Sequence, residues 1–188
     1  GGRVVARPRL SGPWCDLLRG YVASYAQAHK KTNACRALDA LGIAYHLRSY
    51  DVDEADLSAE TVASKLGLPS EQVWKTLCLR GDDRSVLLAV IPAGYELDLK
   101  KLARAADKRA VAPVALKELT ELTGYIRGGV TALACKKPYP VYVDETVLLL
   151  DEISVSAGQR GLQIVIPPAD YVRATQAHVA DLTRPKES

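Results

Sequence analysis

Hydrophobic residues recur at helical spacing in several segments of the chain. These segments are 14–29, 32–41, 58–67, 97–106, 114–122 and 169–182. Thr32 or Asn33 can cap the second segment, and Ser58 can cap the third, which Gly67 can end in the left-handed conformation. Gly20 weakens the first segment, because glycine disfavours a helix interior. The pattern predicts a helix in each segment.

Shorter runs rich in apolar and β-branched residues separate these helices. They lie at 44–50, 74–80, 84–91, 109–112, 139–143, 147–150, 153–156 and 162–166. The second and third runs flank the turn sequence Gly-Asp-Asp at 81–83, so they predict an antiparallel hairpin. Because strands and helices alternate without a regular βαβ repeat, we expect an α+β domain, a mixed and largely antiparallel sheet with surrounding helices.

The composition is that of a globular protein, with 48% hydrophobic and 25% charged residues. No apolar run approaches the roughly 20 residues that a membrane span requires. The cysteines lie far apart, without a CxxC pair, at Cys15, Cys35, Cys78 and Cys135. We therefore expect a cytoplasmic protein with reduced thiols, no metal site, no cofactor and no membrane contact.

The positive charge of the chain is concentrated at its beginning. Of the net charge of +3, residues 1–30 contribute +4, since Asp16 alone opposes five basic side chains, and residues 31–188 contribute −1. We expect a basic extension at 1–30, peripheral or non-native, then one domain at 31–184 and a tail at 185–188. Charge alone gives no argument that the main domain binds nucleic acid.

Lys75 is a candidate functional residue because it interrupts an apolar, strand-like run. An ammonium at the start of a strand that enters the core needs carbonyl or anionic partners, or loses its charge, and such positions are candidates for function. The alternative is an edge lysine whose stem reaches water, which is the more frequent case on spacing alone.

Two glycine-rich stretches, YIRGGVTAL and SAGQRG, are candidate ligand-binding loops. The residues concerned are Gly128, Gly129, Val130, Thr131, Ser156, Gly158 and Arg160. Glycine lets the backbone approach a ligand closely and offer its amides to a carbonyl, a phosphate or a ribose hydroxyl. A tight chain connection uses the same residues, so the pattern leaves both readings open.

Five stretches, taken in order, closely resemble the YbaK/EbsC family: KTNACRALDALGIAYHLRSY, VWKTL, LDLKKLARA, GYIRGGVTALACKK and SAGQRGLQI. The resemblance covers residues 31–184 and extends to the editing domain of bacterial prolyl-tRNA synthetases. It implies a mixed α/β fold around a pocket for the aminoacylated 3′ end of tRNA, and a deacylase that clears Cys-tRNA(Pro). It also implies that Lys75 is the family's functional lysine, that Gly128 to Thr131 form the substrate loop, and that Tyr50 lies beside the pocket.

In members of this type the substrate thiol attacks its own ester, so that the enzyme orients the substrate and stabilises developing charge. The resemblance further implies prolyl-tRNA synthetase as a partner. Two positions depart from the pattern of some members: Ala132 replaces a loop proline, and Gln163 replaces an aspartate, which excludes a carboxylate base there. Two alternatives stay open, an Ala-tRNA(Pro) editing hydrolase and a non-catalytic module of the same fold that binds tRNA or synthetase.

Overall fold

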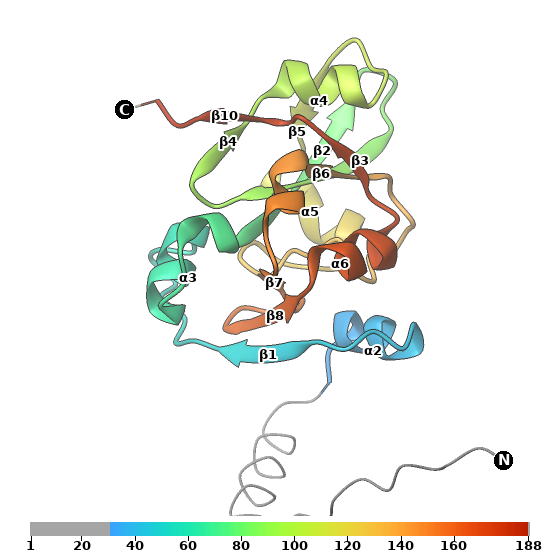
Figure 1. The fold of residues 1–188 in the computed structure, drawn as a ribbon. Coiled ribbons are helices and arrows are strands. Elements are labelled where there is room, and N and C mark those ends of the chain that lie inside the picture. The colour runs from blue at the N-terminus through green and yellow to red at the C-terminus, as the bar shows by residue number, and fades with distance from the viewer. Residues whose placement is uncertain (1–30, 188) are drawn as a thin grey trace, which may run out of the picture. The chain divides into compact units, whose positions relative to one another are not determined.

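The computed structural model describes residues 31–187, so the expected helix at 14–29 and Cys15 lie outside the described residues (Figure 1). The helices are α2 (Asn33–Ala40), α3 (Ala59–Leu66), η1 (Ser70–Gln72), α4 (Leu99–Ala105), α5 (Leu116–Thr123), η2 (Glu145–Leu149) and α6 (Pro168–Thr175), where η marks a 3-10 helix. The strands are β1 (His46–Ser49), β2 (Trp74–Gly81), β3 (Val86–Pro92), β4 (Tyr95–Leu97), β5 (Val111–Pro113), β6 (Val141–Asp144), β7 (Ile153–Ser156), β8 (Leu162–Ile166), β9 (His178–Ala180) and β10 (Thr183–Pro185).

The predicted helix boundaries follow from local capping. The Thr32 hydroxyl oxygen accepts a hydrogen bond from the Cys35 amide at 3.2 Å and begins α2. Ser58 accepts from the Thr61 amide at 3.3 Å and begins α3, which ends at Gly67 with a φ of +65°. These side chains satisfy amides that the first helical turn leaves without partners. Both predictions are confirmed.

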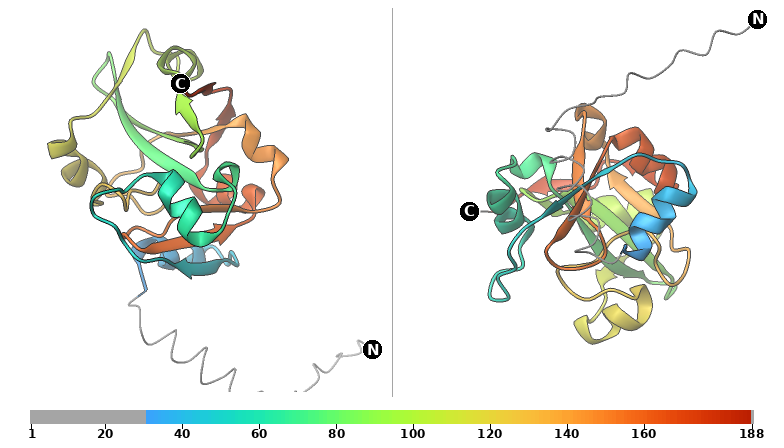
Figure 2. Two further views of the ribbon diagram at one scale, coloured as in Figure 1. Left: turned by 90° about the vertical axis from the view of Figure 1, so that its left-hand side faces the viewer. Right: turned by 90° about the horizontal axis from the view of Figure 1, so that it is seen from below.

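Two main sheets organise the described chain, one with the order β5-β2-β3-β6-β9 and one with the order β1-β8-β7. β2 and β3 form the predicted antiparallel hairpin, while β3, β6 and β9 run parallel. The views in Figure 2 show these sheets with helices around them. The expected α+β fold with a mixed sheet is confirmed.

Hydrophobic cores lie on both faces of the five-stranded sheet. On one face, Cys78 and Leu88 pack with residues of β7, β8, α2 and α6. On the other face, Leu79 and Ile91 pack with α4 through Leu102. Side chains alternate between the two faces of a strand, so neighbouring residues of β2 enter different cores. This alternation determines which side chains surround the site described below.

Two predictions for the C-terminal third are wrong, and Asp144 explains both. The strand expected at 147–150 is instead η2, because the Asp144 carboxylate accepts from the amide and hydroxyl of Thr146 and caps a helical turn. The helix expected at 169–182 ends at Gln176, which has a φ of +52°. Asp144 also accepts from the Leu182 amide at 2.9 Å, and β9 pairs with β6, so tertiary contacts draw this segment into strands.

Among residues 31–187, no helix has both the length and the apolar character needed to cross a bilayer. Within the same residues, Cys35, Cys78 and Cys135 are free thiols.

Candidate active site

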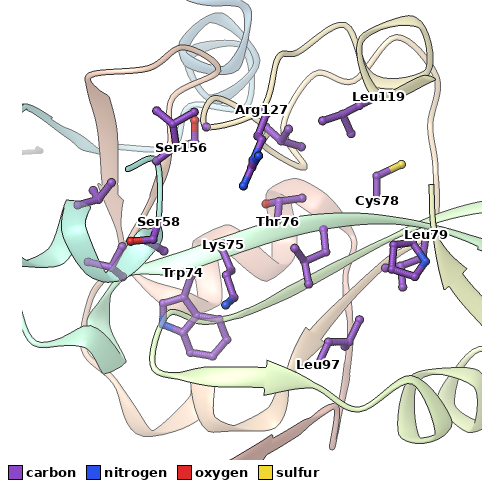
Figure 3. A pocket seen from close by; sticks show the side chains of 18 of the residues that line it. Ser58, Trp74, Lys75, Thr76, Cys78, Leu79, Leu97, Leu119, Arg127 and Ser156 are labelled. Carbon is purple, nitrogen blue, oxygen red and sulfur yellow. The ribbon is translucent and has the colours of Figure 1, made fainter. Parts of the chain in front are cut away.

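The free edge of β2 forms one wall of a large cavity. β5 pairs with only three residues of β2, Leu79 to Gly81, because it ends at Pro113, which has no amide hydrogen to continue the ladder. The Val114 amide still donates to the Cys78 carbonyl at 3.1 Å, and the edge of β2 before that point is open. A cavity of about 560 Å³ follows this edge (Figure 3).

Side chains from both faces of β2 reach the cavity, since it surrounds the open edge. Lys75 and Leu77 contribute from one face, and Thr76 and Cys78 from the other. The remaining wall comes from the start of α3, from both ends of β2, from β4 and α4, from the β5–α5 segment, from the two glycine-rich loops and from β8. Its residues are Leu57, Ser58, Ala59, Glu60, Val62, Val73, Trp74, Leu79, Leu97, Leu99, Pro113, Val114, Leu116, Leu119, Arg127, Gly128, Val130, Ser156 and Gln163.

Lys75 is half-buried, and Figure 3 shows its side chain extending from β2 into the cavity. No ion pair among residues 31–187 includes its ammonium. Burial lowers the pKa of Lys75 below the usual 10.5, and the Glu96 carboxylate opposes this shift. The ammonium is thus partly desolvated and forms no ion pair among residues 31–187, with the Glu96 carboxylate acting on it from beyond ion-pair distance, which suits it to an electron-rich substrate atom.

We expect the Lys75 ammonium to titrate below 10.5, because desolvation disfavours its charged form. Following the 13Cε chemical shift of this lysine against pH measures the midpoint. Glu96→Gln should lower the pKa further, since the carboxylate of Glu96 favours the ammonium. A midpoint at or above 10.5 would contradict the prediction. The lowered pKa also implies that the free energy of unfolding increases as the pH rises from the pKa of Lys75 in the folded state to its pKa in the unfolded state. In that range the unfolded state binds more protons than the folded state.

The two glycine-rich loops pack directly against each other. A Cβ added at Gly129 would lie 3.1 Å from the Gln159 Cα and 3.3 Å from the Arg160 nitrogen. The Arg160 Nε donates to the Arg127 carbonyl at 2.8 Å. Gly129 therefore allows one loop to approach the other, and the pair holds Gly128, Val130 and Ser156 at the cavity wall.

The other predicted site residues lie outside the cavity lining. Thr131 is fully buried, and its carbonyl accepts from the Cys135 thiol at 3.2 Å. Gly158 lies against the Tyr125 ring, and Arg160 is directed to the Arg127 carbonyl. The Tyr50 amide donates to the Gly161 carbonyl at 3.0 Å, and its side chain packs beside α3. In the structure these residues shape the loops and do not line the cavity.

Three cavity residues carry chemistry that the sequence pattern did not assign. The sequence pattern did not identify Arg127 as a site residue, because a charged residue in a loop is typical of an ordinary surface position. Burial raises the pKa of the Cys78 thiol to about 11, so this thiol stays protonated at neutral pH. Gln163 is buried, and its Oε1 accepts from the Ser154 hydroxyl at 3.0 Å. Gln163 could have been found from the sequence, because it is one of the two positions that depart from the family pattern, and it lines the cavity. Ala132, the other such position, lies outside the lining.

Glu60 is the one carboxylate among the lining residues, and it forms an ion pair with Lys186. Lys75 and Arg127 are the lining cations, and histidine is not among the lining residues. Within residues 31–187, no three His, Cys, Asp or Glu side chains gather in a way that fits a metal ion. The lining thus offers positive charge and amide groups, with its single carboxylate already paired.

The family model of the aminoacyl-tRNA editing domain matches residues 53–174, a range that contains the open edge of β2 and both glycine-rich loops. The chain belongs to the aminoacyl-tRNA editing domain family. The identification made from the sequence is confirmed, as is the assignment to enzymes that act on aminoacyl-tRNA.

Three relatives of this editing domain show how far the similarity extends. A protein of Enterococcus faecalis, provisionally named Cys-tRNA(Pro)/Cys-tRNA(Cys) deacylase EbsC, is 39% identical over 157 residues, which are 84% of this chain and 96% of that protein. The proline–tRNA ligase of Lactobacillus johnsonii is 31% identical over 104 residues, only 18% of that enzyme. A crystal structure provisionally described as a trans-editing enzyme for prolyl-tRNA synthetase superposes with a TM-score of 0.72 and 26% identity, covering 83% of this chain and 99% of that one.

Proposed function

We propose that this editing domain deacylates Cys-tRNA(Pro), with Lys75 positioning the substrate and the cysteine thiol of the substrate attacking its own ester. The composition of the cavity lining carries the proposal. Its single carboxylate is paired with Lys186, Gln163 cannot act as a base, and the Cys78 thiol is protonated. A substrate that carries its own nucleophile needs none of these groups.

The reaction we propose is an intramolecular acyl transfer. The substrate sulfur forms a bond to the carbonyl carbon, and the bond from this carbon to the ribose oxygen breaks. The thiol proton ends on the ribose hydroxyl, so the products are free tRNA and a thiolactone, which water opens to cysteine. Lys75 would place its ammonium near the carbonyl oxygen, where negative charge develops, and the largely apolar wall would strengthen that interaction by excluding water.

The relatives support both the substrate and a partner. The name of the Enterococcus protein includes Cys-tRNA(Pro), and the crystal structure is described as acting in trans for prolyl-tRNA synthetase. We infer that the aminoacylated 3′ end enters the cavity and that prolyl-tRNA synthetase assists delivery. A cytoplasmic location is part of this proposal, because aminoacyl-tRNA is its substrate.

Deacylation of a panel of mischarged tRNAs tests the proposal. We expect the purified chain to release amino acid from Cys-tRNA(Pro) faster than from Ala-tRNA(Pro) and Ser-tRNA(Pro), by about 100-fold if the substrate thiol replaces a catalytic group. Ser-tRNA(Pro) is the matched control, because it differs by one atom, oxygen in place of sulfur. Loss of release when the substrate thiol is blocked by methylation would support the intramolecular route.

Other outcomes separate the alternatives. Faster release of alanine than of cysteine would contradict the thiol-assisted route and favour an Ala-tRNA(Pro) hydrolase. Binding of tRNA or of prolyl-tRNA synthetase without any release would identify a non-catalytic module. Repeating the panel with the synthetase present tests whether delivery depends on that partner.

A further inference from the structure

Arg127 is a cavity cation to which the proposed deacylation assigns no task. It is exposed, lines the cavity, and takes part in none of the ion pairs among residues 31–187. Figure 3 shows its guanidinium directed toward Thr76, while Lys75 extends from the opposite side of β2. The cavity thus presents two separate positive groups, one on each side of the open strand edge.

The backbone that carries Arg127 is fixed. The Gly129 amide donates to the Ile126 carbonyl at 2.9 Å and closes a turn around Arg127, with Gly128 at a φ of +85°. Such a turn requires positive φ at its third residue, which favours glycine. The Arg127 carbonyl accepts from the Arg160 Nε at 2.8 Å, so the second loop anchors the turn. The turn therefore places the Arg127 side chain at the cavity, and no hydrogen bond or ion pair among residues 31–187 uses its guanidinium.

We propose that Arg127 binds the 5′ phosphate of the terminal nucleotide of the tRNA. This inference rests on the proposed function, in which the 3′ end enters the cavity. An aminoacyl ester carries an ammonium and no carboxylate, so the anions of this substrate are its phosphates. The phosphate nearest the ester is the one on the same nucleotide. A guanidinium fork matches a phosphate with two parallel hydrogen bonds, and the lining carboxylate of Glu60 is already neutralised by Lys186.

The separation of the two cations gives them different tasks. Lys75 is half-buried and suited to the ester, whereas Arg127 is exposed and suited to a phosphate that keeps part of its hydration. Arg127 would then select an acyl group that is attached to a nucleotide over a free ester of the same amino acid. This selection would come from a contact on the 5′ side of the terminal ribose, away from the reacting carbon on its 3′ side.

Binding of two uncleavable analogues tests the inference. The probes are 3′-cysteinylamino-3′-deoxyadenosine with and without a 5′-phosphate, which differ only in that group, and calorimetry measures their Kd. We expect the phosphate to strengthen binding to the wild-type chain about tenfold or more. Arg127→Gln should abolish this preference and leave binding of the unphosphorylated probe unchanged, while Arg127→Lys should retain part of it. Arg104→Gln, an exposed position on α4 outside the cavity lining, is the matched control and should keep the full preference.

Equal binding of the two probes by the wild-type chain would overturn the inference, as would an equal weakening of both by Arg127→Gln, which would indicate a structural role. Weaker binding of free cysteine by Arg127→Gln, with the phosphate preference intact, would assign Arg127 to the product carboxylate instead. The measurement does not depend on turnover. A chain that shows the phosphate preference but leaves Cys-tRNA(Pro) intact would refute the deacylation proposal and support the phosphate contact.

Discussion

Replacing Lys75 by methionine is expected to lower kcat/KM for Cys-tRNA(Pro) by about 100-fold to 1000-fold, the usual effect of removing one group that stabilises an oxyanion. Methionine keeps most of the length and apolar surface of the side chain, so the change removes mainly the charge. The loss should appear chiefly in kcat, because the charge on the carbonyl oxygen develops in the transition state. Single-turnover deacylation with the enzyme in excess measures this directly.

Stability measurements distinguish a catalytic loss from misfolding in this variant. Lys75 has a lowered pKa and no ion pair among the described residues, so its removal should leave the Tm unchanged or raise it. Lys100→Met, on the exposed face of α4 and outside the cavity lining, should keep full activity. Undiminished deacylation by Lys75→Met would exclude the assigned role, and so would a loss that Lys100→Met reproduces.

Gly158→Ala should reduce the free energy of unfolding by about 2–4 kcal/mol, the sum of two separate costs. Gly158 has a φ of +96°, a conformation in which an alanine is strained, and an added Cβ would lie 2.8 Å from the Tyr125 Cε1. The Tyr125 ring cannot easily shift, because its hydroxyl donates to the Leu133 carbonyl at 2.6 Å and approaches the Ala134 carbonyl at 3.0 Å. Denaturant unfolding measures the change.

Gly42→Ala is the matched control for this substitution. Gly42 also has positive φ, +67°, but an added Cβ would meet nothing within 4 Å. This variant should therefore show the backbone strain alone, about 1–2 kcal/mol. Equal destabilisation by the two variants would mean that the Tyr125 ring yields without cost, and the structural role assigned to Gly158 would then fail.

Local signals explain which elements of the fold were predictable. The caps at Thr32 and Ser58 and the turn before β3 act over a few residues, so the sequence pattern located them. β9 was missed because the residues after Gln176 continue a helical pattern, whereas pairing with β6 makes them a strand. β10 lies beyond the expected helix and forms through pairing with β4. A contact that joins distant segments can override a local preference, and the sequence pattern does not show that contact.

The sequence by itself determined the family and the α+β class, and the motifs around Lys75 made this residue the leading candidate for a functional role. Tertiary structure alone decided what surrounds that lysine. The short pairing of β5 opens the edge of β2, which lets side chains of both faces reach one cavity. It also decided that the glycine-rich loops contact each other, with Gly129 against Gln159 and Gly158 against Tyr125. The physical reason is that a glycine in the sequence shows only that the backbone can adopt positive φ or pack closely at that position. Which neighbouring segment makes the glycine necessary depends on the packing of the folded chain.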